Sequence, residues 1–527
     1  MPDAVTSSLR PLDWGVLGLY LVILTISGIA FSRREQKDTA DYFLGGRRMP
    51  VFAVALSIIA SSLSVATFIG VPQIAYTGDL TYLLTNLGGL LSIGIVAAFF
   101  IPAFYRANVT SIYELLGQRL GEGAKTAASA TFMIGRVFAS GARIYIAAIP
   151  LSLLLFGDHG DAQPEWHLIV SCIALVVISV SYTLAGGIAS VIWTEVVQTI
   201  VLLLAVGAAI WLLLYRIPLS VPQIVETLST AGEGGTSKLL LVNTGAHAAL
   251  PYTLWTSIFA FTLMGLASYG TDHDLAQRML TCKNAIKGGQ SAVLAIVMGI
   301  PIVAMFMVIG LLLFVYYKLP HVMGAAGPSY TPTDSRRVFL TFILREMPPG
   351  LSGLMLAGLL SVGISSLNSA LNAMGATAIK DFYSRWKPDR PPHHYVAAGR
   401  WAVVMWGVVL AGFSCLCIFW QRSSNQNLID FALGVMTFAY AGLLAVFLTA
   451  LFTKRGSADS AIAAILIGFA VITLLQPAIW KQWSPHVGLA GVELAWPWHL
   501  VIGTALSSLV CLMGRRPEKT VDRAQQT

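Results

Sequence analysis

Long apolar stretches, separated by short polar segments, run along most of the chain. A helix of about 20 apolar residues crosses the hydrocarbon core of a bilayer, and the apolar stretches reach that length repeatedly. We therefore predict thirteen membrane spans, at residues 13–31, 49–70, 80–104, 124–156, 167–186, 190–215, 252–270, 291–317, 350–379, 397–419, 428–452, 458–480 and 496–514. The first span looks like an addition to the core, and residues 515–527 are predicted to form a short polar tail.

Composition agrees with this pattern. Of the 527 residues, 56% are hydrophobic and 11% are charged, against about 25% charged in an ordinary soluble domain. A soluble globular enzyme and a disordered chain are both excluded, because such a surface could not be solvated. A β-barrel is excluded as well, because the apolar runs are long and do not alternate with polar residues. The predicted fold class is an all-α polytopic membrane protein.

The net charge of +8 bears on orientation rather than on nucleic acid, because most of the 33 Lys and Arg residues lie between the spans. An odd number of spans puts the two termini on opposite sides. The positive-inside rule then favours an N-terminus outside and a C-terminus in the cytoplasm, with loops 32–48 and 378–400 inside. We expect a multi-pass protein of the plasma (inner) membrane that has the lipid bilayer, and no nucleic acid, as a partner.

Motifs of soluble enzymes are missing from the sequence. It holds no P-loop, no G-x-G-x-x-G, no H-E-x-x-H and no G-x-S-x-G. The nine histidines do not fall at ligand spacing, apart from His393 and His394 in a polar loop. We therefore predict that the protein is not an enzyme, and nothing in the sequence implies an obligatory protein partner.

Two of the predicted spans carry hydroxyl groups at depths where lipid is expected. Residues 60–67 read Ala-Ser-Ser-Leu-Ser-Val-Ala-Thr, which favours a helix break that exposes carbonyls around a cavity or an ion. The alternative is an intact helix in which Ser and Thr bond back to carbonyls one turn earlier. In residues 363–372, Ser365 and Ser369 share one face, where close helix packing is the alternative. Together the two clusters favour a small hard cation such as Na⁺.

Three charged residues also fall inside predicted spans. Glu195 begins the span 190–215, and Arg136 and Arg143 lie seven residues apart in the span 124–156. That spacing puts both arginines on one face, about 10 Å apart. An arginine inside the membrane is costly and usually faces the bundle interior. Pairing with Glu195, with Glu114 or with carbonyls is one interpretation, and a functional role is the other.

Four motifs follow one another at residues 41–50, 181–198, 270–284 and 357–381. In this order they resemble the sodium:solute symporter family, which includes the sodium/glucose, sodium/proline and sodium/sialic acid transporters. The resemblance runs from about residue 13 to 455. The resemblance implies a LeuT-type fold of two inverted five-helix repeats, at residues 49–215 and 252–452. Residues 13–31 and 458–514 would add further helices to a single transmembrane domain, 1–514. The first helix of each repeat should be broken, and in the second repeat Gly265 and Gly270 supply the break.

The resemblance also implies co-transported Na⁺ and its ligands. One Na⁺ site would consist of the carbonyls of Ala60, Leu63 and Val362 and the side chains of Ser365 and Ser366. A second Na⁺ site, or an exit path, would involve Glu195, Ser365, Asn368 and Ser369. At that second site this sequence departs from the relatives that have it, because Glu195 stands for an Asp and Asn368 for a Ser.

The implied solute site departs from the sugar-transporting relatives, because Ser268 replaces their tyrosine and Gly265 replaces a sugar-binding asparagine. It is similar to the sialic-acid type in its hydroxyls and its arginine; those positions are Ser62, Ser64, Thr67 and Arg136. We therefore predict a sodium-coupled symporter that imports a small, carboxylate-bearing solute by alternating access. A neutral solute (a sugar, polyol or vitamin) is the alternative. A sensor or channel on the same fold is a rival that the short tail disfavours, and a membrane enzyme is a distant third.

Overall fold

The computed structural model describes residues 9–32, 44–157, 163–183, 188–324, 327–328, 330–332, 334–423, 427–489 and 491–515. Helices account for almost all of these residues, and no strand occurs among them. Parts of four predicted features lie outside the described residues: the motif at 41–43, most of the loop 32–48, the end of the span 167–186 and the tail from 516.

The helices follow the predicted spans closely. An N-terminal helix, α1 (Pro11–Ser32), precedes the residues predicted as the first repeat. Those residues form α3 (Val51–Ser62), α4 (Val65–Thr77), α5 (Thr85–Ile95), α6 (Ile101–Arg106), α7 (Glu114–Leu120), α8 (Glu122–Phe156), α9 (Glu165–Thr183) and α10 (Ile188–Arg216). A π-helical turn, Val96–Phe100, joins α5 to α6 within one continuous span.

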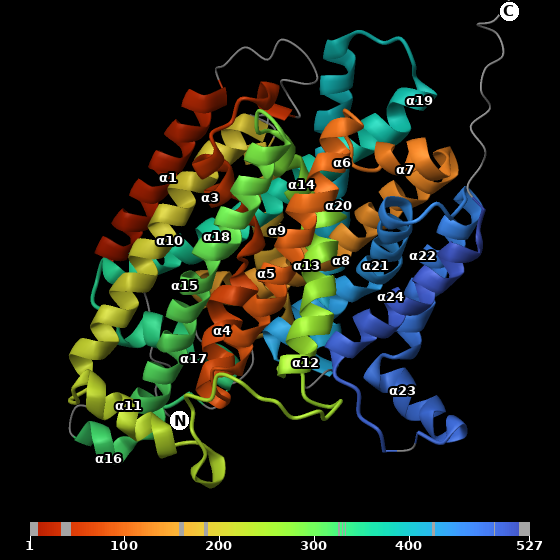
Figure 1. Cartoon of the computed structure of the whole chain (residues 1–527). Coiled ribbons are helices and arrows are strands. Elements are labelled where there is room, and N and C mark those ends of the chain that lie inside the picture. The colour runs from red at the N-terminus through yellow and green to blue at the C-terminus, as the bar shows by residue number, and fades with distance from the viewer. Residues whose placement is uncertain are drawn as a thin grey trace, which may run out of the picture.

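The second half of the chain continues in the same way. Its helices are α11 (Val221–Thr230), α12 (Leu254–Thr256), α13 (Thr262–Gly270), α14 (His273–Leu280), α15 (Ala285–Lys318), α16 (Pro320–Met323), α17 (Val338–Thr341), α18 (Leu351–Thr377), α19 (Ser384–Trp386), α20 (Pro392–Ser423), α21 (Leu428–Phe452), α22 (Ala458–Leu474), α23 (Pro477–Trp483) and α24 (Trp496–Met513). Figure 1 shows α7, α14 and α19 at one end of the bundle and α11, α16 and α23 at the other.

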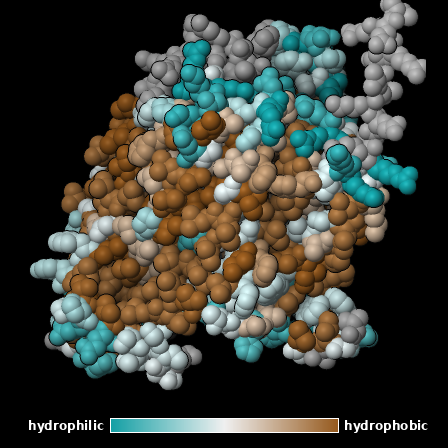
Figure 2. Space-filling model, viewed as in Figure 1, coloured by the Kyte–Doolittle hydropathy of each residue, from teal (hydrophilic) through white to brown (hydrophobic). Residues whose placement is uncertain are grey.

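Length and apolar composition make these helices suitable for a membrane. In the described part of the chain, eight helices are long and apolar enough to cross a bilayer, and two further bent pairs qualify together. Three shorter apolar helices, at residues 11–27, 165–181 and 254–270, account for the remaining predicted spans. Hydrophobic residues cover the middle of the face in Figure 2, and hydrophilic residues gather towards its ends. The prediction of a polytopic all-α membrane protein is confirmed.

The span predicted at 49–70 is broken, as the sequence indicated, and continues to Thr77. Helices α3 and α4 meet at an angle of 66°, and Leu63 and Ser64 between them are extended. The amide of Ser64 faces the hydroxyl of Thr67 at 3.4 Å, whereas in an unbroken helix it would donate to the Ala60 carbonyl. The break therefore takes the helical donor away from the Ala60 carbonyl.

The break predicted within 252–270 and the uninterrupted span predicted at 458–480 were both wrong. Helix α13 runs through Gly265 without interruption and ends at Gly270, after which α14 begins at His273. A Cβ at Gly265 would lie 2.0 Å from the Ser92 hydroxyl, so this glycine permits close packing against α5 rather than a break. The span predicted at 458–480 ends at Leu474 and turns by 80° into α23, because Pro477 cannot continue α22.

Candidate cation and solute site

A cavity of about 200 Å³ lies at the centre of the bundle, beside the break between α3 and α4. Helices α3, α5, α8, α13 and α21 all contribute to its wall. Of the predicted solute-binding residues, Ser62, Arg136, Gly265 and Ser268 line this cavity. Ser64 instead lines a smaller cavity nearby, and Thr67 faces the amide of Ser64. The structure therefore brings most of the predicted set together.

Arg136 is held by two carboxylates that follow α13. Its guanidinium donates to Oδ1 of Asp272 at 2.5 and 3.1 Å, and it lies 2.9 Å from Oδ2 of Asp274. The hydroxyl of Tyr440, on α21, donates to the other oxygen of Asp272 at 2.9 Å. All four side chains are buried. The charge of Arg136 is thus matched within the protein, which is the pairing interpretation that its position in the sequence left open.

The same chain of ion pairs continues through Arg278. Asp274 pairs with Arg278 one turn later on α14, and Arg278 lies 2.9 Å from Oε1 of Glu195 on α10. Burial raises the pKa of Asp274, but Arg278 and then Arg136 outweigh burial and hold that pKa below its usual range. Asp274 therefore remains a carboxylate between two guanidinium groups.

Glu195 gathers hydroxyl groups from two helices around one carboxylate. Its Oε1 accepts from Ser61 at 2.9 Å, from Ser365 at 3.2 Å and from Ser369 at 2.6 Å, and its Oε2 accepts from Ser57. The carboxylate therefore joins α3, just before the break, to α18. Asn368 does not take part, because its side chain lies 3.2 Å from the Thr183 hydroxyl on α9.

Arg143 lines the same cavity as Arg136 but has a different environment. Its guanidinium lies 3.5 Å from the Ser366 hydroxyl and 3.6 Å from the Met436 sulfur. Among the described residues, no carboxylate oxygen lies within 4.0 Å of it. Arg143 is therefore a cation on the cavity wall that no acid of the described chain pairs with.

A second, much smaller cavity of about 10 Å³ adjoins Arg143 at the helix break. Ser64, Ser140 and Ser366 line it, and the buried hydroxyl of Ser140 has no hydrogen-bond partner. Such a volume is about what one water-sized particle needs. The break and α18 are in contact here, since a Cβ at Gly363 would lie 3.3 Å from a Val65 methyl group. Ser366, a predicted Na⁺ ligand, thus faces a cavity of suitable size and polarity.

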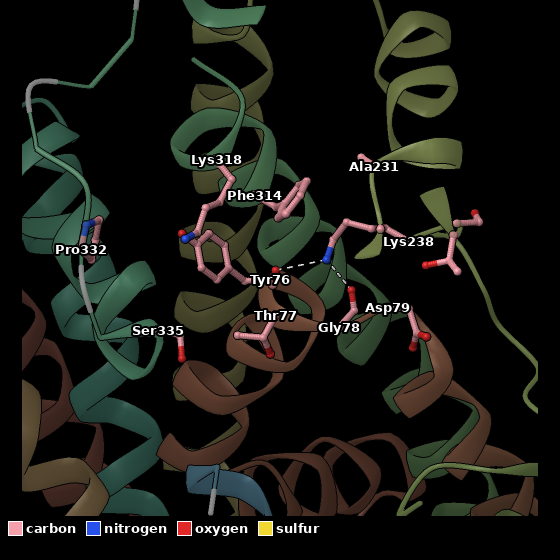
Figure 3. A pocket seen from close by; sticks show the side chains of 13 residues that line it. Tyr76, Thr77, Gly78, Asp79, Ala231, Lys238, Phe314, Lys318, Pro332 and Ser335 are labelled. Atoms are coloured by element: carbon pink, nitrogen blue, oxygen red, sulfur yellow. Dashed lines mark hydrogen bonds between the residues drawn. The ribbon is translucent and has the colours of Figure 1, made fainter. Parts of the chain in front are cut away.

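A third cavity, of about 420 Å³, lies at the far end of α4 (Figure 3). There Lys238 donates to the carbonyls of Tyr76, at 3.2 Å, and of Gly78. Its ammonium also lies 4.1 Å from the centre of the Phe314 ring. Carbonyls at a helix C-terminus and an aromatic face both stabilise a cation. Lys238 therefore joins the segment after α11 to the C-terminal end of α4, the second half of the broken span.

Several of these residues had no predicted role, namely Asp272, Asp274, Arg278, Tyr440 and Lys238. The first three belong to the motif at 270–284, which was used only as a family marker. The sequence did hold a signal for a charged site here, because two acids and one base lie within seven residues directly after an apolar span. The sequence could not show that Arg136 and Glu195 are their partners, because those residues come from other helices.

Comparisons with known proteins agree with this geometry. The family model described as "Sodium:solute symporter family" matches residues 42–468. The chain is 27% identical to the sodium/sialic acid symporter of Proteus mirabilis, over 88% of each chain. It is 28% identical to the human sodium/iodide cotransporter, over 89% of this chain and 71% of that protein. It is 26% identical to the human sodium-coupled monocarboxylate transporter 1, over 87% and 72%, respectively.

A solved structure of a Na⁺-coupled sialic acid symporter, in a substrate-bound outward-open state, has the same fold. The TM-score is 0.78, with 24% sequence identity, over 96% of this chain and 97% of that one. The predicted LeuT-type fold is confirmed by this likeness. Members of the matching family are transporters, and Na⁺ is the co-transported ion. The chain belongs to the sodium:solute symporter family.

Proposed function

We propose that the protein imports a small, carboxylate-bearing solute together with Na⁺, and that Arg143 binds the carboxylate. The observation that carries this proposal is the contrast between the two arginines of the cavity. Arg136 has two aspartates, whereas Arg143 has none within 4.0 Å in the described part of the chain. A guanidinium beside a cavity inside the helix bundle calls for an anion, and a carboxylate fits its two-pronged donor geometry. The proposed carboxylate partner is therefore Arg143 instead of Arg136.

The rest of the cavity supports a small solute with both polar and apolar parts. Ser62, Asn86 and Ser268 offer hydrogen-bonding groups, while Leu433 and Met436 offer apolar contacts. The three relatives named above are called symporters of sialic acid, iodide and monocarboxylates, so an anionic solute agrees with their names. A neutral solute would leave Arg143 without a counter-charge in the loaded state.

Na⁺ is proposed to bind at the helix break, to the carbonyls of Ala60, Leu63 and Val362 and the hydroxyls of Ser365 and Ser366. Support comes from the released Ala60 carbonyl and from the small cavity at Ser366. Arg143 lies between the two proposed sites, 3.5 Å from Ser366. Its charge would repel Na⁺ until a carboxylate neutralises it. The solute would thus favour Na⁺ binding, and by linkage Na⁺ would favour solute binding to the same degree.

The proposed orientation places the N-terminus outside and the C-terminus in the cytoplasm of the plasma (inner) membrane. The end of the bundle that carries α7, α14 and α19 would then face the cytoplasm (Figure 1). The cavity of Lys238, at the opposite end, would open to the outside. In this orientation an inward Na⁺ gradient drives import.

Uptake into proteoliposomes tests the function. The purified protein is reconstituted, and uptake of labelled carboxylates, amino acids, sugars and vitamins is measured with and without an inward Na⁺ gradient. We expect Na⁺-driven uptake of one or more carboxylates and no uptake when K⁺ replaces Na⁺. Na⁺-driven uptake restricted to uncharged solutes would contradict the carboxylate proposal, and uptake indifferent to Na⁺ would contradict symport.

A further inference from the structure

The cavity of about 420 Å³ at the far end of α4 contains neither the proposed Na⁺ site nor the proposed solute site. It lies between the ends of α4 and α15, the loop after α11 and the segment before α17 (Figure 3). The charged side chains that the structure describes in its wall are Lys238, Lys318 and Asp79. Asp79 already has partners, since its Oδ1 accepts from the amide and the hydroxyl of Thr81, at 2.9 and 2.6 Å. Among these side chains, bases therefore outnumber acids.

Three elements each bring an unused hydrogen-bond donor to the wall of this cavity. The ammonium of Lys318, at the end of α15, has no hydrogen bond or ion pair among the described residues. The hydroxyl of Tyr76 on α4 has no hydrogen-bond partner either, although the residue is only 4% exposed. The Ser335 hydroxyl, before α17, accepts from Gln73 at 3.2 Å, so its own proton is free to donate. Buried polar groups are rarely left without a partner, so these donors indicate a site for a group that accepts hydrogen bonds.

The positive charge of the wall decides which kind of acceptor fits. Lys238 is buried, and its ammonium donates to the carbonyls of Tyr76 and Gly78 beside the Phe314 ring. Figure 3 shows Lys238 and Lys318 on either side of that ring. Two ammonium groups repel a cation such as Na⁺, and hydrogen bonds to an ionised oxygen are about twice as strong as those to a neutral one. The volume is also many times what one water molecule needs. An anion with two or more oxygens therefore fits better than Na⁺ or a single water.

We propose that this cavity binds a small oxyanion, a carboxylate or a phosphate group, through Lys318, the Tyr76 hydroxyl and the Ser335 hydroxyl. Because these donors come from α15, α4 and the segment before α17, the anion would hold the second half of the broken span against its neighbours. Arg143 takes no part in this site, which is therefore independent of the proposed function. Lys318 is exposed, so a solute in the water or a lipid head group can supply the oxyanion.

Stabilisation of the purified full-length protein by anions tests this inference. The background is Arg143→Gln, so that the proposed solute site does not contribute. Its melting temperature is measured in sodium chloride and in sodium acetate, gluconate or glycerol phosphate, at the same Na⁺ concentration and ionic strength. We expect at least one of these oxyanions to raise the melting temperature by a few degrees relative to chloride, because a ligand stabilises the folded state that binds it.

The shift in melting temperature should depend on the donors of the cavity. Adding Lys318→Gln to the background should abolish the shift. Adding Tyr76→Phe should raise the anion concentration for half of the shift severalfold, because one hydrogen bond to the anion is lost. Lys481→Gln is the matched control and should keep the shift, since Lys481 is an exposed lysine of α23, at the same end of the bundle.

The possible results have separate consequences. Stabilisation by acetate or gluconate would identify a carboxylate from solution as the ligand, and stabilisation by glycerol phosphate alone would identify a lipid head group. No shift with any of the three, or an equal shift after Lys318→Gln, would overturn the inference. If Lys318→Gln does not fold, an unchanged half-maximal concentration in Tyr76→Phe would overturn it instead. Absence of Na⁺-driven uptake would contradict the proposed function and leave this site standing.

Discussion

Arg136 and Arg143 lie seven residues apart on α8 and line one cavity, yet their surroundings differ completely. Arg136 lies among Asp272, Asp274 and Tyr440, and it completes a chain of buried ion pairs that reaches Glu195. Arg143 contacts a serine hydroxyl and a methionine sulfur. The difference teaches that the residue type alone does not decide whether an arginine inside the bundle supports the fold or is available to a ligand; the acids that surround it do.

The largest expected effect is on stability, at Arg136. Arg136→Gln leaves two buried carboxylates with one guanidinium fewer, and breaking a buried ion pair costs about 3–5 kcal/mol. We expect a large fall in the melting temperature in detergent and little folded protein. Asp272→Asn combined with Arg136→Gln should recover part of the loss, because it removes the excess charge as well. A single variant with the wild-type melting temperature would show that the pairing contributes nothing.

The second effect is on transport, at Arg143. Arg143→Gln removes a cation that has no acidic partner in the part of the chain that the structure describes, so the melting temperature should change little. Loss of a charged hydrogen-bonding partner costs about 1.5–3 kcal/mol, which corresponds to a rise of about tenfold to hundredfold in the KM for a carboxylate solute. Arg143→Lys should give an intermediate KM, because it keeps the charge and loses the two-pronged geometry. A stability loss as large as that of Arg136→Gln, with unchanged KM, would reverse the two roles.

A smaller effect is expected for Na⁺ at Ser366. Ser366→Ala removes one proposed oxygen ligand with little change in volume, so the Na⁺ concentration for half-maximal uptake should rise severalfold. Ser361→Ala is the control on the same helix, since Ser361 donates to Tyr20 of α1, at 2.5 Å, and does not line the small cavity. Its Na⁺ dependence should match the wild type. Equal Na⁺ dependence in both variants would remove Ser366 from the site.

The smallest effect is expected at Lys238, a buried cation whose partners include the carbonyls of Tyr76 and Gly78 and the ring of Phe314. Lys238→Met keeps an unbranched side chain against Phe314 and loses the hydrogen bonds to α4. The expected loss is about 1–2 kcal/mol, seen as a modest fall in melting temperature with the Na⁺ dependence unchanged. A fall as large as that of Arg136→Gln would contradict this ranking of the two sites.

Much of the fold could be predicted from the sequence, because apolar length and helix breaks are local properties. The span 428–452 has the predicted bounds, and the serine-rich break in the first repeat lies where it was expected. Gly265 was misread, because a glycine in a helix can serve a break or a close contact, and only the neighbouring helix distinguishes the two. Pro477 predicts the turn after α22, because a proline cannot continue a helix.

The candidate site was only partly predictable, for a physical reason. Charged residues could be placed on helix faces, but a face does not reveal the partner across the cavity. Arg136 finds its acids more than a hundred residues later in the chain, and Glu195 pairs with Arg278 instead of with either arginine of α8. Which arginine remains without an acid follows from these long-range contacts alone.

The most direct test of Arg143 as the carboxylate partner compares a carboxylate solute with the uncharged amide of the same molecule. Once uptake has identified a carboxylate substrate, its affinity is measured beside that of the primary amide of the same molecule, in the wild type and in Arg143→Gln. The account predicts that the wild type binds the carboxylate about tenfold to hundredfold more tightly than the amide, and that Arg143→Gln binds the two about equally. An equal preference for the carboxylate in both proteins would contradict it.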